Sequence, residues 1–384
     1  MKSIHVFTVF TTPKSFFDGQ FRYLVNHGEE IILVSSFHTD AEAFSKRNGV
    51  RFVPIEMPRA MAPLIILKAI CAIVKIIKTE KPDAVFGHTP VGALCAMVAS
   101  KLCKVNKRIY YRHGVVYTTM TGLKREIFRL EEKFVSALST TIVNVSYSLS
   151  RLAIRDKLNS DEKQYVIGHG TCGGIDAINT FNPVLLDKYL LERKRENLHI
   201  KEADIIYGFC GRICNDKGIP ELIDGFELFQ KRNSCVKAKL VLIGNFDVRD
   251  RLSDECQRQI GANRNIVVTG LIEKDVIPYF YSLLDVFVFP SHREGFGMCV
   301  IEASAMEKPI LVSHVHGCED SIVEHETGEY IELTPESICH GMELMLDDNL
   351  RRYFGKAGRK KVLEWYDTQV MWPLVLDFYR NKLK

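Results

Sequence analysis

Short apolar runs alternate with longer amphipathic segments almost without a break along this chain. In the first half the apolar runs predict strands over residues 4–10, 30–35, 52–56, 83–87, 108–112, 141–145 and 164–167. The segments between them are long enough for helices. Because strands that alternate with helices pair in parallel, this half predicts one doubly wound parallel sheet.

A second series of the same kind follows. Its strands are predicted over residues 205–210, 239–243, 266–269, 286–289, 310–312 and 329–332. The glycine-rich segment 168–174 separates the two series and predicts a hinge. A chain of 384 residues also exceeds what one core usually fills. We therefore expect an α/β protein of two domains, over residues 1–170 and 171–367.

Composition excludes several classes of protein. Hydrophobic residues make up 46% and charged residues 26%, as in ordinary globular proteins. The net charge of +4 is mild, and no basic tract interleaved with aromatics argues for nucleic acid as a partner. Eleven cysteines without CxxC pairs predict reduced thiols rather than a disulfide framework or a zinc site. The first residues read as a strand and not as a signal peptide, so we expect a cytoplasmic protein.

The segment 61–77 is strongly apolar, but Lys68 and Lys75 interrupt it. A membrane span needs about 20 consecutive apolar residues, so this segment predicts a helix before the strand 83–87. Lys68 and Lys75, with Lys78 and Lys81, would also suit a helix face that touches anionic lipid. An ordinary packed helix and peripheral contact with the inner face of the cytoplasmic membrane both stay open.

Candidate chemistry is densest in residues 294–302, after the apolar strand 285–290. Glu294 and Glu302 bracket a turn that leads into a helix predicted over 297–306. The turn consists of Gly295, Phe296, Gly297 and Met298. Because the first N–H groups of a helix lack intrahelical partners, such a terminus favours an anion, and a diphosphate is the natural guest. Glu302 would accept hydrogen bonds from ribose hydroxyls and Glu294 would point at the group the diphosphate carries. The alternative is an ordinary turn with solvated carboxylates.

A second cluster follows the strand 205–210, where Gly211, Arg212 and Lys217 precede a helix predicted to run from about residue 218 to 229. The two cations would lie at the ligand-binding edge of the sheet and clamp a pyrophosphate, Arg212 as a fork and Lys217 as a point charge. The sequence lacks the Walker pattern of P-loop proteins. Either cation taken singly could merely solvate a loop.

Together these motifs resemble the retaining glycosyltransferases of the GT-B fold, glycosyltransferase family 4. The resemblance covers nearly the whole chain and is carried by residues 17–20, 81–89, 112–114, 211–218, 270–274 and 294–302. It implies two Rossmann-like doubly wound domains that face each other across a cleft. It also implies that a C-terminal helix, 368–384, packs back on the N-terminal domain.

The resemblance assigns roles to particular residues. The C-terminal domain would bind the donor through Gly211, Arg212, Lys217, the turn 295–298 and Glu302, with the loop at Ile272 reading the base. Gly19 would let the backbone approach the phosphates. His113 would face the donor sugar, and Tyr117, Thr118 and Thr119 would meet the acceptor. The residues expected to act in catalysis are Glu294, His113, Arg212 and Lys217.

The implied reaction moves a sugar from a nucleotide-diphosphate donor to a hydroxyl of a glycan or polyprenyl-diphosphate-linked acceptor, with retention of anomeric configuration. UDP-sugars are the commonest donors of such enzymes and GDP-sugars the main alternative. The leaving phosphate takes the acceptor proton, so neither a protein base nor a metal or other cofactor is expected. Residues 112–130 are similar to bacterial enzymes that build capsule, O-antigen or exopolysaccharide. Two alternatives remain, a non-hydrolysing UDP-sugar epimerase of the same fold and a noncatalytic nucleotide-sugar-binding module.

Overall fold

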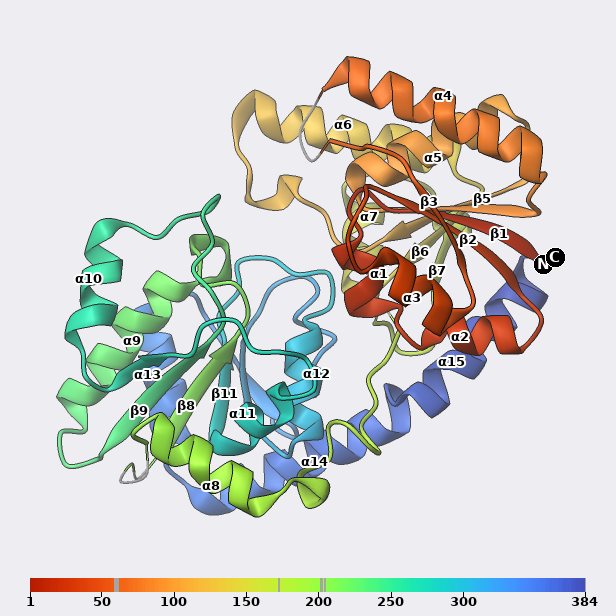
Figure 1. Ribbon diagram of the computed structural model, residues 1–384. Helices are drawn as coiled ribbons and strands as arrows, with labels where there is room; N and C mark the ends of the chain where they lie inside the picture. The colour runs from red at the N-terminus through yellow and green to blue at the C-terminus, as the bar shows by residue number, and fades with distance from the viewer. Residues whose placement is uncertain (59–61, 172, 201–202, 204, 384) are drawn as a thin grey trace. The chain divides into compact units, whose positions relative to one another are not determined.

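The computed structural model describes residues 1–384 apart from 59–61, 172, 201–202, 204 and 384 (Figure 1). The chain forms two compact units. The first comprises Met1–Gly174 and Thr368–Lys384, and the second Ile175–Asp367. Met61 and Cys172, in the segments predicted as a helix and as a hinge, lie outside the described residues. The change of unit after Gly174 falls at the end of the segment 168–174.

The first unit contains a parallel sheet of seven strands in the order β3-β2-β1-β4-β5-β6-β7. Its strands are β1 (Lys2–Val6), β2 (Glu30–Ser35), β3 (Arg51–Pro54), β4 (Ala84–His88), β5 (Lys107–Arg112), β6 (Thr141–Asn144) and β7 (Gln164–Val166). Central strands such as β4 are buried along their whole length, as expected from the apolar run that forms all of β4 except its last residue, His88. The predicted doubly wound sheet is confirmed.

Helices cover both faces of this sheet (Figure 1). They are α1 (Thr11–Phe16), α2 (Gln20–Asn26), α3 (Ala41–Asn48), α4 (Pro63–Glu80), α5 (Pro90–Leu102), α6 (Gly122–Leu138), α7 (Tyr147–Arg155) and α15 (Thr368–Asp377), with the short 3-10 helices η1 (Tyr117–Thr119) and η2 (Asp161–Lys163) and the π-helix η5 (Phe378–Lys382). One face carries α4, α5 and α6, and α5 packs against both of the others. The opposite face carries α1, α2 and α3, and α15 lies against α2.

The first strand is shorter than predicted, because the chain leaves the sheet after Phe7. The backbone N–H of Phe7 still donates to the carbonyl of Val34, at 2.8 Å. The backbone N–H of Thr8 donates instead to the hydroxyl of Thr89, at 3.0 Å, and α1 begins at Thr11. The prediction that the strand continues to residue 10 was therefore wrong, since a side chain from the β4–α5 junction replaces the neighbouring strand as acceptor.

The second unit contains a parallel sheet of six strands in the order β10-β9-β8-β11-β12-β13. Its strands are β8 (Ile205–Cys210), β9 (Ala238–Ile243), β10 (Ile266–Val268), β11 (Val286–Phe289), β12 (Ile310–Ser313) and β13 (Gly328–Ile331). Its helices are α8 (Lys188–Asn197), α9 (Ile219–Arg232), α10 (Asp254–Ala262), α11 (Ile277–Leu283), α12 (Met298–Ala305), α13 (Pro335–Leu344) and α14 (Asp348–Trp365), with turns η3 (Pro183–Leu185) and η4 (Asn215–Lys217). Each strand lies where the apolar pattern predicts it.

Several helices start at the capping residues that the sequence supplies. The side chains of Ser146, Ser253, Thr334 and Asp347 accept hydrogen bonds from first-turn backbone N–H groups of α7, α10, α13 and α14. Such caps stabilise a helix by about 1 kcal/mol each. None of the helices in the described ranges has both the length and the apolar run that crossing a bilayer requires. The cysteines of those ranges are free thiols.

Candidate active site

Glycines bring the loop after β8 close to the carboxyl ends of β9 and β11. A Cβ on Gly218 would lie 1.8 Å from the carbonyl oxygen of Pro290, and one on Gly244 would lie 1.9 Å from that of Gly211. Gly218 also has a left-handed backbone, with φ of +67°. Any other residue at these positions would push the loop away from the sheet, so the glycines place η4 and its Lys217 against the end of β11.

Lys217 forms an ion pair with Glu294. The two motifs that the sequence marks, 211–218 and 294–302, are thereby brought together. Both side chains are largely buried, with 14% and 17% of their surfaces exposed, and the ammonium lies 5.4 Å from the centre of the Phe289 ring. Burial lowers the pKa of Lys217, but the Glu294 carboxylate outweighs it and raises the pKa above its usual value. Lys217 therefore remains a cation at this sheet edge.

Arg212 occupies a more open position on the same loop. Its guanidinium donates to Asp247, which follows β9, at 2.6 Å, and half of its side chain is exposed. Asp247 accepts further hydrogen bonds from the backbone N–H groups of Arg249 and Asp250. Hydrogen bonding from Arg212 lowers the pKa of Asp247 to about 2. Asp247 therefore holds the guanidinium beside the loop at neutral pH.

The turn before α12 has the form of an anion site. Gly297 precedes the helix with φ of +75° and offers no side chain as a cap. A Cβ on Gly317 would lie 2.4 Å from the carbonyl oxygen of Glu294, so the β12–β13 connection holds the turn in place. Phe296 is buried and its ring packs edge-on against Tyr366, 5.2 Å away. Of the turn residues 295–298, Phe296 thus offers a ligand only its backbone, next to a helix N-terminus that favours negative charge.

Glu302 lies within α12 and accepts a hydrogen bond from the Tyr281 hydroxyl at 2.8 Å. Burial raises the pKa of Glu302 to about 7, against the lowering effects of Tyr281 and Lys274. Ile272 is half-buried in the loop after β10, which begins with the left-handed Gly270. Both residues come from the same sheet edge as Lys217, because the carboxyl ends of parallel strands share one edge.

The predicted site residues of the first unit have distinct environments. His113 follows β5, and its Nε2 is hydrogen-bonded to Nδ1 of His88 at 2.9 Å. Gly19 caps α2 with φ of +82°, and a Cβ there would lie 2.9 Å from the Trp372 ring, which gives this glycine a packing role in the first unit. Arg112, which precedes His113 in the predicted motif 112–114, is fully buried and forms an ion pair with Glu132 on α6.

Tyr117 is the predicted acceptor residue whose position differs most from expectation. Its side chain is fully buried, and its hydroxyl donates to Asp156 at 2.8 Å. Thr118 and Thr119, in the same turn η1, are exposed. The structure thus gives Tyr117 a packing role, since aromatic burial outweighs solvation of a loop tyrosine once the hydroxyl has a partner. Thr118 and Thr119 remain available at the surface.

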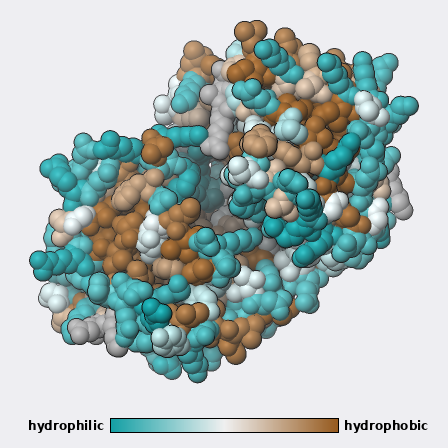
Figure 2. All heavy atoms as spheres, viewed as in Figure 1, coloured by the Kyte–Doolittle hydropathy of each residue, from teal (hydrophilic) through white to brown (hydrophobic). Residues whose placement is uncertain are grey.

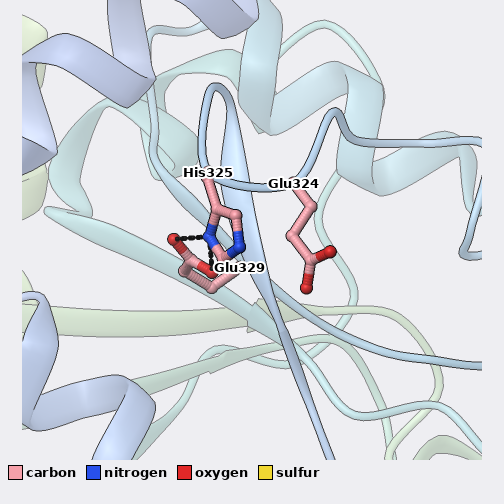
Figure 3. Close-up of side chains that lie close together, drawn as sticks. All are labelled: Glu324, His325 and Glu329. Carbon is pink, nitrogen blue, oxygen red and sulfur yellow. Dashed lines mark hydrogen bonds and ion pairs between the residues drawn. The ribbon is translucent and has the colours of Figure 1, made fainter.

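One group of side chains with metal-ligand chemistry lies near β13. Glu324, His325 and Glu329 come together there, as Figure 3 shows. His325 Nδ1 is 2.8 Å from Glu329, and that carboxylate raises the pKa of His325. Glu324 and His325 are exposed. A surface ion pair accounts for this group.

Sequence reasoning missed three partners of the predicted residues. Tyr281 contacts Glu302, Asp247 contacts Arg212, and the buried Ser291 donates to Glu294 at 3.4 Å. Ser291 lies two residues after β11, so its place near the carboxyl end of a strand could have marked it in the sequence. Tyr281 and Asp247 are 21 and 35 residues from their partners, so no local pattern connects them.

Comparison with known families assigns both units. The model of the glycosyl transferases group 1 matches residues 192–361, and that of the glycosyl transferase 4-like family matches residues 3–146. The chain is 31% identical over 388 residues to the capsular polysaccharide biosynthesis glycosyltransferase CapM of Staphylococcus aureus, covering 100% of this chain and 99% of that protein. The chain therefore belongs to the family 4-type glycosyltransferases of the GT-B fold.

More distant relatives agree. The UDP-Gal:alpha-D-GlcNAc-diphosphoundecaprenol alpha-1,3-galactosyltransferase of Escherichia coli is 21% identical over 315 residues, covering 82% of this chain and 79% of that protein. A crystal structure of Anabaena Alr3699/HepE in complex with UDP and glucose has a TM-score of 0.79 and 14% identity, covering 99% of this chain and 100% of that one. At this identity the structural likeness concerns the fold, which confirms the predicted pair of Rossmann-like units.

Proposed function

We propose that this glycosyltransferase moves a sugar from a UDP-sugar to a hydroxyl of a lipid-linked glycan, with retention, in the synthesis of a cell-surface polysaccharide. The observation that carries the proposal is the contact of Lys217 with Glu294 beside the N-terminus of α12. A buried cation and a helix terminus suit a diphosphate, and a carboxylate in contact with that cation suits the sugar attached to it.

The proposed donor, a UDP-sugar, is supported by residues of the second unit and by the names of two similar proteins. Arg212, Lys217 and the turn 295–298 would bind the diphosphate, and Glu302 would accept hydrogen bonds from the ribose. Gly211 and Ile272 lie at the same sheet edge, where backbone groups would meet the phosphates and the base. UDP is supported as the nucleotide by the names of the galactosyltransferase relative and of the HepE complex.

Catalysis would be chiefly electrostatic. When the bond to the sugar breaks, negative charge develops on the diphosphate, and Lys217, Arg212 and the α12 terminus would stabilise it. The leaving phosphate would take the proton of the acceptor hydroxyl on the same face of the sugar, which gives retention. Glu294 and His113 would hold the transferred sugar. Cationic side chains then supply the charge that a divalent ion supplies elsewhere, so turnover should be insensitive to chelators.

The acceptor would meet the first unit. Thr118 and Thr119 are the exposed candidates for contacts with acceptor hydroxyls. The relative that acts on a diphosphoundecaprenol-linked sugar supports a lipid-linked acceptor. Such an acceptor stays in the bilayer, so the enzyme would have to approach an anionic lipid surface.

Two helices of the first unit have surfaces suited to anionic lipid. The exposed face of α4 combines Leu64 and Leu67 with Lys68, Lys75 and Lys78. On α6, a stripe of exposed apolar side chains recurs at helical spacing, at Leu123, Ile127, Leu130 and Phe134. Hydrophobic and hydrophilic residues lie side by side on the surface where α4 lies, at the top of Figure 2. Apolar contact flanked by lysines is how peripheral helices bind membranes reversibly.

One experiment separates the transferase from its two alternatives. Purified protein is incubated with labelled UDP- and GDP-sugars, with and without a polyprenyl-diphosphate-linked sugar. Release of UDP that requires the acceptor, with label appearing in the lipid-linked product, supports the proposal. Inversion at C2 of the sugar without acceptor would identify an epimerase, and binding without turnover a noncatalytic module.

A further inference from the structure

Three histidines and one tyrosine form a continuous hydrogen-bonded chain inside the first unit. His5 lies on β1, His88 at the end of β4 and His113 directly after β5, and these three strands are neighbours in the sheet. Nδ1 of His5 is 3.0 Å from Nε2 of His88, and Nδ1 of His88 is 2.9 Å from Nε2 of His113. At the other end, the hydroxyl of Tyr379 in η5 lies 2.9 Å from Nε2 of His5.

Aromatic rings enclose this chain and hold the imidazoles in place. His5 stacks on Phe86 at 4.3 Å, and His88 stacks on Phe7 at 4.0 Å. Their side chains are almost completely buried. Burial lowers the pKa of His5 to about 3 and that of His88 well below its usual value, and it lowers the pKa of His113 to about 3. Each ring is therefore neutral, with one N–H donor and one nitrogen acceptor.

The hydrogen bonds along a chain of neutral imidazoles can all point in one of two directions. The buried hydroxyl of Tyr379, at one end of the chain, favours one of them. Burial raises the pKa of Tyr379 well above its usual value, so the phenol keeps its proton. Within the described part of the chain, His5 is the hydrogen-bond partner of that hydroxyl. If His5 donated to the phenol oxygen, the phenol proton would be buried without an acceptor, which is costly. The favoured arrangement has the Tyr379 hydroxyl donating to Nε2 of His5.

The hydrogen bond donated by Tyr379 then fixes which nitrogen carries the proton in each histidine of the chain. His5 with an accepting Nε2 carries its proton on Nδ1 and donates to His88, which likewise donates from Nδ1 to His113. We infer that Tyr379, His5 and His88 are positioning residues that hold His113 as the Nδ1–H tautomer, so that any ring-nitrogen contact of His113 with a substrate is a donated hydrogen bond. Nε2 of His113 accepts this hydrogen bond, so the proton of its neutral ring lies on Nδ1.

This inference rests on the proposed function only for its consequence in catalysis. If His113 contacts the transferred sugar, an N–H aimed at it selects a sugar oxygen that accepts. The tautomer itself is a property of the protein alone and can be measured without any substrate.

The test is long-range ¹H–¹⁵N NMR on histidine-labelled enzyme, which distinguishes Nδ1–H from Nε2–H, with the His113 signal assigned through His113→Gln. We expect His5, His88 and His113 all as Nδ1–H, which is the minor tautomer of histidine in water. A wild-type His113 that carries its proton on Nε2 would overturn the inference directly, whether or not the enzyme turns over the sugars tested.

Tyr379→Phe then tests the origin of the direction. It removes one oxygen and should release His113 toward Nε2–H, with kcat lowered on the order of fivefold, the size of one neutral hydrogen bond, and UDP affinity unchanged. Tyr165→Phe is the matched control, because Tyr165 packs on the adjacent Phe378 in the same region of the unit. An unchanged His113 tautomer in Tyr379→Phe would overturn the role of the tyrosine. A changed tautomer with unchanged kcat would remove only the catalytic consequence.

Discussion

Each of the two cations at the candidate site, Lys217 and Arg212, forms an ion pair with a carboxylate. The burial of each pair sets the cost of removing its cation. Lys217 is buried against Glu294, whereas Arg212 reaches Asp247 from a half-exposed position. A diphosphate that enters beside α12 would share Lys217 with Glu294. Removing Lys217 would therefore leave a partly buried carboxylate without its partner next to the incoming negative charge. Removing Arg212 would expose Asp247 to water instead, which costs less.

Arg212→Ala and Lys217→Ala should both lower kcat/KM, and Lys217→Ala should have the larger effect. The expected loss is on the order of 2–4 kcal/mol in the barrier for Lys217 and less for Arg212. Steady-state kinetics and UDP calorimetry measure it. The double variant Lys217→Ala/Glu294→Gln should recover part of the UDP affinity, because the unpaired carboxylate is gone. Wild-type rates in both single variants would refute the assignment.

Substitutions of Glu294 and Glu302 should differ in their effects on UDP affinity and on the rate of transfer. Glu302→Ala should weaken UDP binding in the absence of any sugar, since the contact proposed for Glu302 is with the ribose. Glu294→Gln should leave UDP affinity nearly unchanged and slow transfer, because the contact proposed for Glu294 requires the sugar. Calorimetry with UDP and initial rates with the full donor distinguish the two. Equal changes in both measurements would mean that the roles are divided wrongly.

Nucleotide binding should depend on pH through Glu302, whose pKa is raised to about 7 by burial. The carboxylate accepts ribose hydrogen bonds better than the acid, so UDP affinity should increase as the pH rises through 7 and then level off. Below pH 7 the loss should approach about tenfold per pH unit. Glu302→Gln should lack this component and retain only the titration of UDP itself. Tyr281→Phe should move the midpoint upward, since the Tyr281 hydrogen bond stabilises the carboxylate.

At the scale of elements, helix α4 illustrates how one segment serves two environments. Ile66, Ala69, Ile73 and Ile77 face the core at helical spacing. The opposite side carries the lysines, and Lys78 and Lys81 also line an open pocket of about 680 Å³ with Lys104 and Lys107. Packing explains the buried stripe completely. It does not explain the exposed leucines beside the lysines, which is why a lipid surface is the proposed partner.

The enzyme should bind vesicles of anionic phospholipid at low salt and be released at high salt, because screening weakens the attraction between lysine and lipid. Exchange of Lys68, Lys75, Lys78 and Lys81 for Gln should abolish most of this binding in a sedimentation assay. The control variant exchanges four exposed lysines of the second unit, Lys188, Lys231, Lys356 and Lys360, and carries the same change in charge. Equal binding of the two variants would assign α4 a packing role alone.

At the scale of the whole molecule, the C-terminal segment completes the first unit although it follows the second along the chain. The indole N–H of Trp372 donates to the carbonyl of Gly173 at 3.0 Å, and its ring lies 5.6 Å from that of Tyr23 on α2. Trp365, only seven residues earlier, packs within the second unit under the ammonium of Lys361. The two tryptophans therefore report on different units.

Trp372→Ala should destabilise the first unit locally, and Trp365→Ala should destabilise the second. Loss of Trp372 should increase hydrogen exchange in α2 and β1 and leave β8 and β11 protected, because a large aromatic contributes about 3–5 kcal/mol where it is well packed. Loss of Trp365 should do the opposite. Hydrogen exchange with mass spectrometry measures both. Exchange that increases equally in both units after either change would mean that the units unfold together.

Much of the architecture could be predicted because its causes are local. Apolar runs of four to six residues form the buried strands wherever both faces of a sheet are covered, as in β4, β8 and β11. Glycines such as Gly218 and Gly297 mark strand-to-helix turns because other residues resist a positive φ. Since parallel strands share one carboxyl edge, the order of these motifs along the chain also predicts which residues gather there.

Only the tertiary structure decided which groups pair at that edge and in what state of protonation. Lys217 and Glu294 are 77 residues apart, and Tyr379 reaches His5 across 374. Burial, which raises the pKa of Glu302 and withdraws Tyr117 from the surface, likewise depends on elements remote in the chain. Contact and desolvation arise from packing between distant segments, whereas strands and turns follow from the side chains and backbone preferences of neighbouring residues. The sequence by itself therefore determined the fold and the location of the candidate site, and packing determined its charges and hydrogen bonds.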